Sequence, residues 1–391
     1  MSSSGPFPAW KCKVLLQDST LVGSAPLFTE LACRFSIIAY GLPIDAAMIA
    51  FHDLIAHLPH AAHGGGNPVL TGVASLTEAQ AGELTFAEHV RLLPQLQGTQ
   101  ASAVILPLDT TLQETAQARG LAWVAMPDPR LGFALAISHF YQPAALPPGI
   151  HPTAVVDPTA TLGADVRIGP KAVIQAEAVV GDRVQIGAGV VLGVQVRVGA
   201  GSILYPNCTI YERTEIGENC VIHSGAVIGS DGFGFVPTPQ GWVKMPQSGR
   251  VVLEAGVEIG ANTCIDRPAV GETRIGQGSK LDNLVHIGHG CRLGAHCALA
   301  AQVGLAGGVV LEDGVILGGQ VGAANQVRVG SRAQVAAKSG LHQDVPAGAV
   351  VAGYPAMPLP LWRKAMNVVQ RLPDIYQTWR QIKRGAGQPP A

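Results

Sequence analysis

The chain is poor in aromatic residues and carries almost no net charge. Phe, Trp and Tyr make up 5% of its 391 residues, and the formal net charge is −1. Aliphatic side chains must therefore fill the core, and a hydrophobic fraction of 48% supplies them. So little net charge gives no electrostatic case for nucleic acid, and we expect no nucleic-acid partner.

Paired cysteine motifs and long apolar runs are also absent. The seven cysteines form no C-x-x-C pair, and no stretch offers the ~20 uncharged apolar residues of a membrane span. We therefore expect a cytoplasmic protein without a membrane span. Four cysteines stand two positions before an aliphatic residue of the repeat described next, where we expect small buried hydrophobes in a reducing compartment: Cys208, Cys220, Cys291 and Cys297.

The dominant pattern is an apolar residue at every sixth position. It runs without a miss from Ile150 to Ile228, resumes at Leu253, and continues from Ile275 to Leu341. Glycine often follows the apolar residue, and a small or β-branched residue often stands two positions before it. A helix repeats at 3.6 residues and a strand at 2, so a period of six fits neither alone. It is typical of a solenoid in which each hexapeptide forms one flat side.

Three such sides make a triangular coil of 18 residues, so that residue i+18 lies about 4.8 Å along the axis from residue i. Glycine and small residues suit the tight corners. Hexapeptide coils in known folds are wound left-handed, an exception to the right-handed crossover rule. The predicted fold is therefore mainly β: a left-handed parallel β-helix with a small N-terminal α/β domain and a C-terminal helix.

Four parts follow from these patterns. Residues 1–47 show no period, and we expect a dispensable extension, with Met48 a candidate for the true start. Residues 48–149 read as an α/β domain that resembles a nucleotide-binding unit, and 150–345 as the β-helix. The period breaks at 229–252, where an inserted loop is a usual place for function. In the α/β domain we expect strands at 69–73, 84–86, 103–106 and 122–124, and helices at 87–97, 112–119 and 129–141, after a short helix near 48–58.

The last part, 346–391, contains a predicted helix over 359–384 that is rich in basic residues. One interpretation is a solvated helix face. The other is a helix that caps an oligomer and presents positive charge to an acidic partner. The basic residues, against the single acid Asp374, are Arg363, Lys364, Arg371, Arg380, Lys383 and Arg384.

One polar segment, LDNLVHIGHG at 281–290, suggests chemistry. Leu281 and Ile287 belong to the inward columns, so the polar residues between and after them lie at corners or outer faces, where we expect a cluster: Asp282, Asn283, His286 and His289. An imidazole titrates near ~6.5 and is a competent general base at neutral pH, and a carboxylate can orient it. The residues alone leave open which imidazole acts.

Gly307 follows His289 by 18 residues, so the two should lie at the same corner in successive coils. A glycine there lets its backbone N–H approach a ligand and donate to an oxyanion. A base beside an oxyanion donor is the minimal equipment for acyl transfer from a thioester. The competing interpretation is a metal site, because β-helical trimers can gather histidines across an interface. Its candidate ligands are His286, His289 and either His296 or His223.

From about 69 to 366 the chain resembles the UDP-3-O-acylglucosamine N-acyltransferases of lipid A synthesis. The segments that carry the resemblance are LTGVASLTEAQAGELTF (70–86), NCVIHSGAVIGSDGFGF (219–235), GVEIGANTCIDR (256–267), LDNLVHIGHG and LWRKA (361–365). The resemblance implies a homotrimer that moves a 3-hydroxyacyl chain from acyl carrier protein to the 2-amine of a 3-O-acylated UDP-glucosamine. It implies no cofactor and no metal, because the acyl group is carried on the phosphopantetheine of the carrier protein.

The resemblance also assigns roles. It implies that His289 is the general base, that Asp282 is its partner carboxylate, and that the amide of Gly307 receives the oxyanion. Asn283 and His286 become neighbours on the substrate side. A positioned base contributes ~10²–10⁴ in rate, and one oxyanion donor about 3 kcal/mol.

Two positions depart from the family pattern. The family stacks uracil between two aromatic residues six apart; here the first matches Phe86 and the second is Leu92, with His89 in place of the usual Asn between them. A further family histidine is replaced by Gln326, which cannot carry charge. Phe86 also has a plain structural interpretation, as the end of a strand in the domain core.

Three functions therefore stand. The first is the N-acyltransferase of lipid A synthesis. The second is a hexapeptide acyltransferase that acts on another nucleotide sugar or takes its acyl group from coenzyme A, which the altered uracil pocket keeps open. The third is a non-catalytic β-helix in an assembly.

Overall fold

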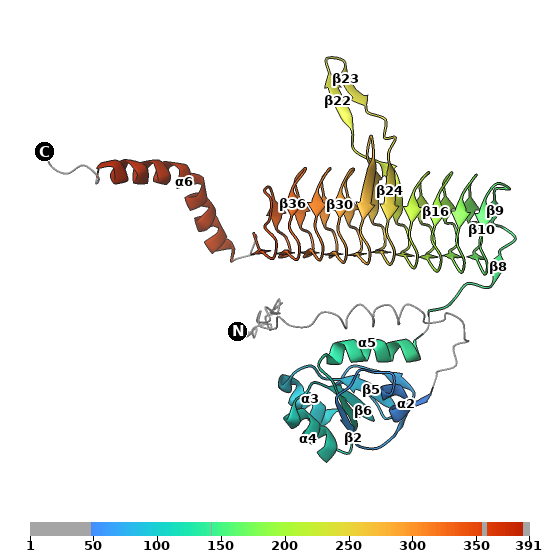
Figure 1. Cartoon of the computed structure of the whole chain (residues 1–391). Coiled ribbons are helices and arrows are strands. Elements are labelled where there is room, and N and C mark those ends of the chain that lie inside the picture. Colours follow the sequence, from blue (N-terminus) through green and yellow to red (C-terminus); the bar gives the residue numbers. More distant parts are fainter. Residues whose placement is uncertain (1–47, 142, 354–357, 386–391) are drawn as a thin grey trace, which may run out of the picture. The chain divides into compact units, whose positions relative to one another are not determined.

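The structure is a computed structural model that describes residues 48–141, 143–353 and 358–385 (Figure 1). The expected extension, 1–47, lies outside the described residues. Contacts divide the chain into two compact units, Met1–Ala145 and Leu146–Ala391.

The N-terminal unit is an α/β domain built on a five-stranded sheet. The strand order is β2 (Ala62–Gly64), β7 (Ala122–Ala125), β6 (Ala103–Leu106), β5 (Glu83–Phe86) and β4 (Gly72–Val73). β2 runs antiparallel to β7 and the other pairs are parallel. A separate antiparallel pair joins β1 (Ile49–Ala50) to β3 (Val69–Leu70). The predicted strands are present, and β1 and β2 are additional.

Helices pack on both faces of this sheet, because successive side chains of a strand point to opposite sides. α2 (Phe51–Ile55) and α5 (Pro129–Phe140) pack on the face that holds Leu84 and Ile105. α3 (Leu93–Gly98) and α4 (Thr110–Ala118) pack on the face that holds Val104 and Leu106. The helix expected over 87–97 is shorter: a 3₁₀ turn, η1 (Val90–Leu92), precedes α3, whose first turn carries a proline as helix starts often do.

The second unit is the left-handed parallel β-helix, with three sheets of two- to five-residue strands. The nine-stranded sheet holds β10 (Thr161–Leu162), β13 (Val179–Val180), β16 (Arg197–Val198), β19 (Glu215–Ile216), β24 (Arg250–Leu253), β27 (Glu272–Ile275), β30 (Arg292–Leu293), β33 (Val310–Leu311) and β36 (Arg328–Val329). The ten-stranded sheet holds β9 (Val155–Val156), β12 (Val173–Ile174), β15 (Val191–Leu192), β18 (Thr209–Ile210), β21 (Val227–Asp231), β26 (Cys264–Arg267), β29 (His286–Ile287), β32 (Gly304–Leu305), β35 (Gly322–Ala323) and β38 (Gly340–Leu341). The eleven-stranded sheet holds β8 (Gly149–Ile150), β11 (Arg167–Ile168), β14 (Gln185–Ile186), β17 (Ile203–Leu204), β20 (Val221–Ile222), β25 (Glu258–Ile259), β28 (Lys280–Leu281), β31 (Ala298–Leu299), β34 (Ile316–Leu317), β37 (Gln334–Val335) and β39 (Val350–Val351).

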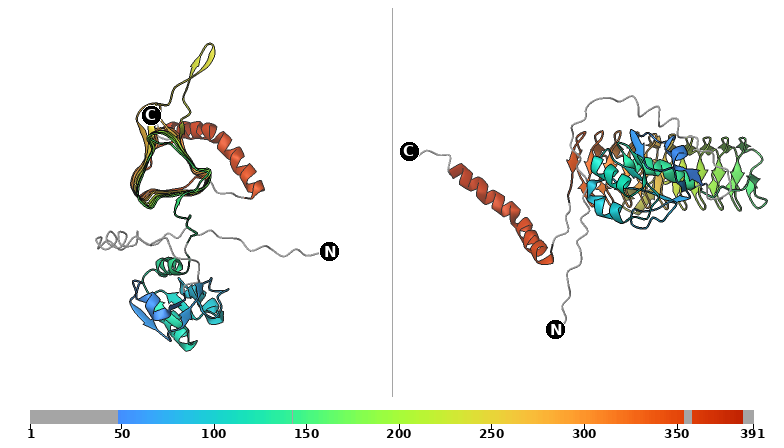
Figure 2. Two further views of the ribbon diagram at one scale, coloured as in Figure 1. Left: turned by 90° about the vertical axis from the view of Figure 1, so that its right-hand side faces the viewer. Right: turned by 90° about the horizontal axis from the view of Figure 1, so that it is seen from below.

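The sheets form the three sides of a triangular prism, which is plain in the view along its axis (Figure 2). Paired residues are 18 apart along most of its length, as in Ile174 with Leu192. Two insertions break that register. The longer one leaves the prism between β21 and β24 and carries the hairpin of β22 (Phe235–Thr238) and β23 (Gly241–Lys244). The shorter one, between β26 and β27, makes the step from Ile265 to Ile287 22 residues.

The core is the predicted stack of aliphatic columns, together with the small residues two positions before them. Ile150 is an exception at 52% exposed, because it stands in the first coil. The glycines that follow the aliphatic residues serve close approach: a β-carbon on Gly181 would lie 2.8 Å from the backbone nitrogen of Ala200. Many corner residues with left-handed backbone are not glycine, as Asn207 and Asn262 show with φ of 64° and 56°.

The C-terminal part begins later than 346 in the sense that β39 still pairs with β37. α6 (Leu359–Gly385) is the predicted tail helix. It bends along its length in Figure 1, and Pro373 inside the helix accounts for a bend, because proline removes one backbone hydrogen bond. No helix among the described residues is both long and apolar enough to cross a membrane.

Candidate functional site

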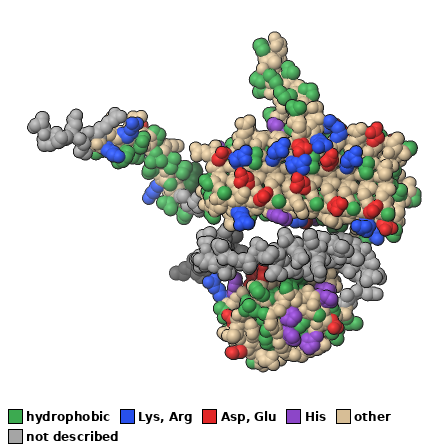
Figure 3. All heavy atoms as spheres, in the orientation of Figure 1, with side chains coloured by type: hydrophobic (Ala, Val, Ile, Leu, Met, Phe, Trp, Pro, Cys, Tyr) green, Lys and Arg blue, Asp and Glu red, His purple; other side chains and the backbone are tan. Residues whose placement is uncertain are grey.

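The three outer faces of the β-helix differ in charge. The nine-stranded sheet faces the viewer in Figures 1 and 3 and carries acidic and basic side chains side by side. Ion pairs link several of them, such as Arg250 with Glu215 and Arg274 with Glu254. The outward residues of the ten-stranded sheet are instead uncharged or small, with one imidazole among them: Val155, Val173, Val191, Thr209, Val227, Cys264, His286, Gly304, Gly322 and Gly340.

His289 and Gly307 meet at the corner where the chain leaves this ten-stranded sheet. A β-carbon on Gly307 would lie 2.6 Å from Nε2 of His289, so only glycine leaves the ring its place. The N–H of Gly308 donates to the carbonyl of His289 at 2.9 Å, which ties the two coils together. Within the described residues no hydrogen bond uses the N–H of Gly307. The structure thus brings together a half-buried imidazole and an unengaged backbone donor.

The carboxylate nearest to these imidazoles is that of Asp266, which the sequence did not single out. Asp266 is 7% exposed and accepts a hydrogen bond from the hydroxyl of Ser230 at 2.8 Å. Its Oδ2 lies 3.6 Å from Nε2 of His286. Burial raises the pKa of the Asp266 carboxyl, against the hydrogen bond from Ser230 and the charges of His286 and His289.

The inserted loop is fastened beside His289. Gly232 donates to the carbonyl of Arg267 at 3.1 Å, and a β-carbon on Gly232 would lie 2.5 Å from Cβ of His289. Arg267 holds the carboxylate of Asp231 with two nitrogens, at 3.0 and 2.8 Å, and also pairs with Glu212. Hydrogen bonds from Lys244 and Arg267 keep the pKa of Asp231 below its usual value. The loop base is therefore a fixed wall of the site.

These residues line one groove of about 550 Å³. Phe233, at 82% exposed, stands at its rim beside His286 and His289. Its floor runs along the ten-stranded sheet over three outward glycines one coil apart, Gly304, Gly322 and Gly340. No positive φ requires glycine at these positions, and a β-carbon would meet nothing within 4 Å at the first two and only a side-chain nitrogen at 3.7 Å at the third. Packing within the chain therefore does not explain them.

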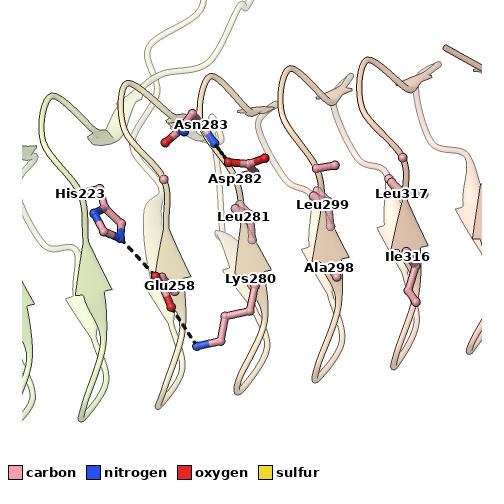
Figure 4. A pocket seen from close by; sticks show the side chains of 13 residues that line it. His223, Glu258, Lys280, Leu281, Asp282, Asn283, Ala298, Leu299, Ile316 and Leu317 are labelled. Atoms are coloured by element: carbon pink, nitrogen blue, oxygen red, sulfur yellow. Dashed lines mark hydrogen bonds and ion pairs between the residues drawn. The ribbon is translucent and has the colours of Figure 1, made fainter. Parts of the chain in front are cut away.

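Asp282 and Asn283 lie elsewhere, at the corner where the chain enters the ten-stranded sheet. They line a second pocket of about 680 Å³ on the eleven-stranded sheet (Figure 4). In that pocket Glu258 contacts His223 at 3.1 Å and Lys280 at 3.4 Å, and an apolar floor follows, formed by Ala298, Leu299, Ile316 and Leu317. Asp282 accepts from the backbone N–H of Asn283 at 2.7 Å.

The expected single cluster of Asp282, Asn283, His286 and His289 is therefore wrong for one chain. Six residues carry the backbone along one full side of the triangle, so Asp282 and His289, seven apart, bracket β29 at opposite corners. The structure brings His286 and His289 into one groove and leaves Asp282 outside it.

The metal interpretation fares no better within the chain. His223 lines the pocket of Asp282, and His296 is exposed at a third corner, between β30 and β31. Among the described residues, no group of three or more His, Cys, Asp or Glu side chains could hold a metal ion.

In the N-terminal unit, Phe86 ends β5 and its ring stacks on Phe133 of α5 with centroids 4.5 Å apart. His89 is exposed and lines a hollow of about 470 Å³ with Arg91 and Asp109. Leu92 packs into the core on the other sheet face. One face of the Phe86 ring is thus already covered, and Leu92 does not stand opposite it.

Gln326 is exposed at the corner one coil beyond the glycine pair Gly307 and Gly308, and its backbone N–H donates to the carbonyl of Gly307 at 3.1 Å. The four cysteines at small positions are buried, as expected. Burial raises the pKa of Cys208 and Cys220 to about 11 and that of Cys291 to about 12, so these thiols stay protonated at neutral pH.

The sequence did hold a signal for Asp266. The apolar period steps by ten rather than six between Ile265 and Ile275, which reveals four inserted residues. Counting 22 rather than 18 places Asp266 directly beside Gly288, next to His289.

Comparisons with known proteins agree with this architecture. Residues 67–139 match the family model for UDP-3-O-(3-hydroxymyristoyl) glucosamine N-acyltransferase, LpxD. Residues 150–193 and 195–230 match the bacterial transferase hexapeptide model of six repeats.

Curated relatives extend the likeness over most of the chain. A UDP-3-O-acylglucosamine N-acyltransferase of Synechocystis sp. is 65% identical over 321 residues, 82% of this chain and 93% of that protein. One of Trichodesmium erythraeum is 63% identical over 318 residues, 81% of this chain and 92% of that protein. Among solved structures, the UDP-N-acetylglucosamine acyltransferase of Francisella novicida is 29% identical, with a TM-score of 0.43, over 52% of this chain and 67% of that one.

Proposed function

The chain belongs to the UDP-3-O-acylglucosamine N-acyltransferase family and is an acyltransferase, and from that premise we propose how it works. It moves a 3-hydroxyacyl chain from the phosphopantetheine thiol of acyl carrier protein to the 2-amine of UDP-3-O-(3-hydroxyacyl)-glucosamine, in lipid A synthesis. His289 is the general base and the N–H of Gly307 receives the oxyanion. The observation that carries this proposal is the contact of His289 with Gly307.

The chemistry follows from that contact. The amine attacks the thioester carbonyl while His289 takes a proton from its nitrogen, and the carbonyl electrons move to an oxygen that faces the N–H of Gly307. A backbone donor fixed in advance stabilises that charge without reorganising, which is worth about 3 kcal/mol. On collapse the C–S bond breaks, and the proton on His289 passes to the leaving thiolate.

A homotrimer supplies the missing carboxylate. The ten-stranded sheet has the uncharged outer face, and we place it toward a three-fold axis. Its two bounding corners then meet the opposite corners of neighbouring copies, as a closed heterologous ring requires. Asp282 and His289 bracket the same strand and so stand at the same height along the prism. Asp282 of one copy therefore faces His289 of the next and orients its ring.

α6 supports the same assembly. Its apolar residues alternate at spacings of four and three, the pattern of a coiled-coil seam: Leu361, Ala365, Val368, Leu372, Ile375, Trp379 and Ile382. Most of these side chains are exposed in the single chain, Leu372 by 49% and Trp379 by 52%. Three copies would bury the seam on one another and leave the basic residues outward, where they suit an acidic carrier protein.

The same trimer gives the acyl chain a path. The groove over the three outward glycines begins at His289 and runs along the axis. The apolar floor of the second pocket, from Ala298 to Leu317, starts beside Asp282 and runs the same way. Facing each other across the interface, the two would enclose an extended hydrocarbon.

The UDP group is the less certain contact to place from residues alone, and we assign it to the N-terminal unit through the exposed side of Phe86 and His89, with Asn283, His286 and Gln326 around the sugar and phosphates. The second candidate function, transfer to another nucleotide sugar or from coenzyme A, rests on the same site. Phe133 against Phe86 and Leu92 in the core favour it, because they remove the usual two-ring grip on uracil.

The test is single-turnover acylation of UDP-3-O-(3-hydroxyacyl)-glucosamine by 3-hydroxyacyl carrier protein, followed by mass spectrometry. We expect amide product from the wild type and a loss of about 10²–10⁴ in rate for His289→Ala. His296→Ala, at another corner, should keep the wild-type rate. Acyl-coenzyme A as donor and a different UDP-amino sugar as acceptor separate the alternatives: faster turnover with either would replace the proposal.

A further inference from the structure

We propose that His286, held by Asp266, is a second proton acceptor in the groove, which deprotonates the sugar ammonium before His289 assists the attack. This inference rests on the proposed function, because it concerns an amine acceptor. His286 is then a catalytic residue and Asp266 a positioning residue.

The need for a second acceptor comes from counting protons. An amine beside electron-withdrawing groups titrates near ~8, as an α-amino group does, so most of the acceptor is ammonium at neutral pH. The ammonium must lose one proton to expose its electron pair, and a second when the C–N bond forms. His289 handles only the second, which it returns to the leaving thiolate. The overall change is ammonium plus thioester to amide, thiol and one free proton.

His286 is placed to take the first proton. It shares the groove with His289 and is the one imidazole among the outward residues of the ten-stranded sheet. Its register partner in the next coil is Gly304, where a β-carbon would have no neighbour within 4 Å. Space for the sugar amine therefore opens between the two imidazoles, over Gly304 and Gly307.

Asp266 sets the direction of the transfer. It faces Nε2 of His286, at 3.6 Å, so Nε2 carries the hydrogen and Nδ1 is left to accept. The charge of Asp266 also favours the imidazolium that results. Ser230 donates only a hydroxyl hydrogen bond to this carboxylate, and the adjacent cation, Arg267, is committed to Asp231 and Glu212. The carboxylate charge is thus directed at the imidazoles.

The other titratable groups around His286 do not compete for this role. His289 stands at the reacting nitrogen, His342 lies at the far end of the groove, and Asp231 is paired with Lys244 and Arg267. The side chain of His286 is 54% exposed. It can therefore pass its proton to water and be neutral again before the next turnover.

The experiment is the pH dependence of kcat/KM for the full chain between pH 7 and pH 9, with acyl carrier protein as donor. The wild type should change little, because it accepts the bound ammonium. His286→Gln should use only the free amine, so its kcat/KM should fall about tenfold from pH 8 to pH 7 and approach the wild type at pH 9. Asp266→Asn keeps the imidazole and the acceptor for Ser230, and should move the profile the same way.

His296→Gln, an exposed imidazole outside the groove, is the matched control and should follow the wild type. An equal loss at every pH in both variants, or no loss in either, overturns the inference while leaving the proposed function standing. A wild type that forms no amide with verified substrates would instead reject the proposed function itself. Circular dichroism of each variant shows whether the fold is kept.

Discussion

The ring of His289 occupies the space that a side chain at position 307 would need. Its Nε2 would lie 2.6 Å from any β-carbon there, and the two residues are one coil apart at a single corner. The base and the oxyanion donor of the proposed reaction are thus fixed by the same backbone register that builds the prism.

Gly307→Ala should remove most activity while keeping the fold. The new methyl group must displace the His289 ring, so we expect a loss of about 10²–10³ in kcat, the size seen when an oxyanion donor is removed. Gly319→Ala is the control, because a β-carbon there meets only the carbonyl oxygen of Ala301 at 3.4 Å. Similar kinetics for the two variants would contradict the role of this contact.

Mixed trimers test the pairing of Asp282 with His289. Each of the chains Asp282→Asn and His289→Ala should be nearly inactive alone. Unfolded together and refolded in equal amounts, they should regain activity at roughly one site in four, because an intact His289 then meets an intact Asp282 of its neighbour. No recovery in refolded trimers, with wild-type chains recovering fully in parallel, would return both residues to one chain.

The glycine floor should decide which acyl chains fit. Gly340→Leu fills the groove at its far end, one coil beyond Gly322, and one coil spans about 4.8 Å or roughly four methylene groups. We expect the preferred 3-hydroxyacyl donor to become shorter, with unchanged rates for short donors. Thr161→Leu, on the charged nine-stranded sheet, should leave the chain-length profile as it is.

Asp266 should cost the protein stability at neutral pH. Burial raises the pKa of this carboxyl above its unfolded value, so the folded state binds its proton more tightly. Stability from this group is present at low pH and is lost as the pH rises through the range between the unfolded and folded pKa. Asp266→Asn should therefore melt at a higher temperature than the wild type at pH 7.5, with the difference shrinking toward pH 4. A lower melting temperature at pH 7.5 would contradict this account.

Most of the fold could be predicted from the sequence because its order is local and periodic. An inward residue every sixth position specifies strands, corners and stacking together, and the family segments specify the class of enzyme. The helix at 87–97 was overestimated because apolar spacing does not show where a helix begins; the proline of α3 does. The strand β2 was missed because its residues, Ala62–Gly64, have little strand propensity.

The candidate site divides along the same line. The sequence alone determined that His289 meets Gly307, since 18 residues separate them and the coil length admits no other neighbour. Only the tertiary structure decided that Asp282 stands a full side of the triangle away from His289, and that Asp266 stands beside it instead. Seven residues in sequence are distant here because a straight side of the prism lies between them. Twenty-three are adjacent because a coil lengthened by four residues returns the backbone to the same corner.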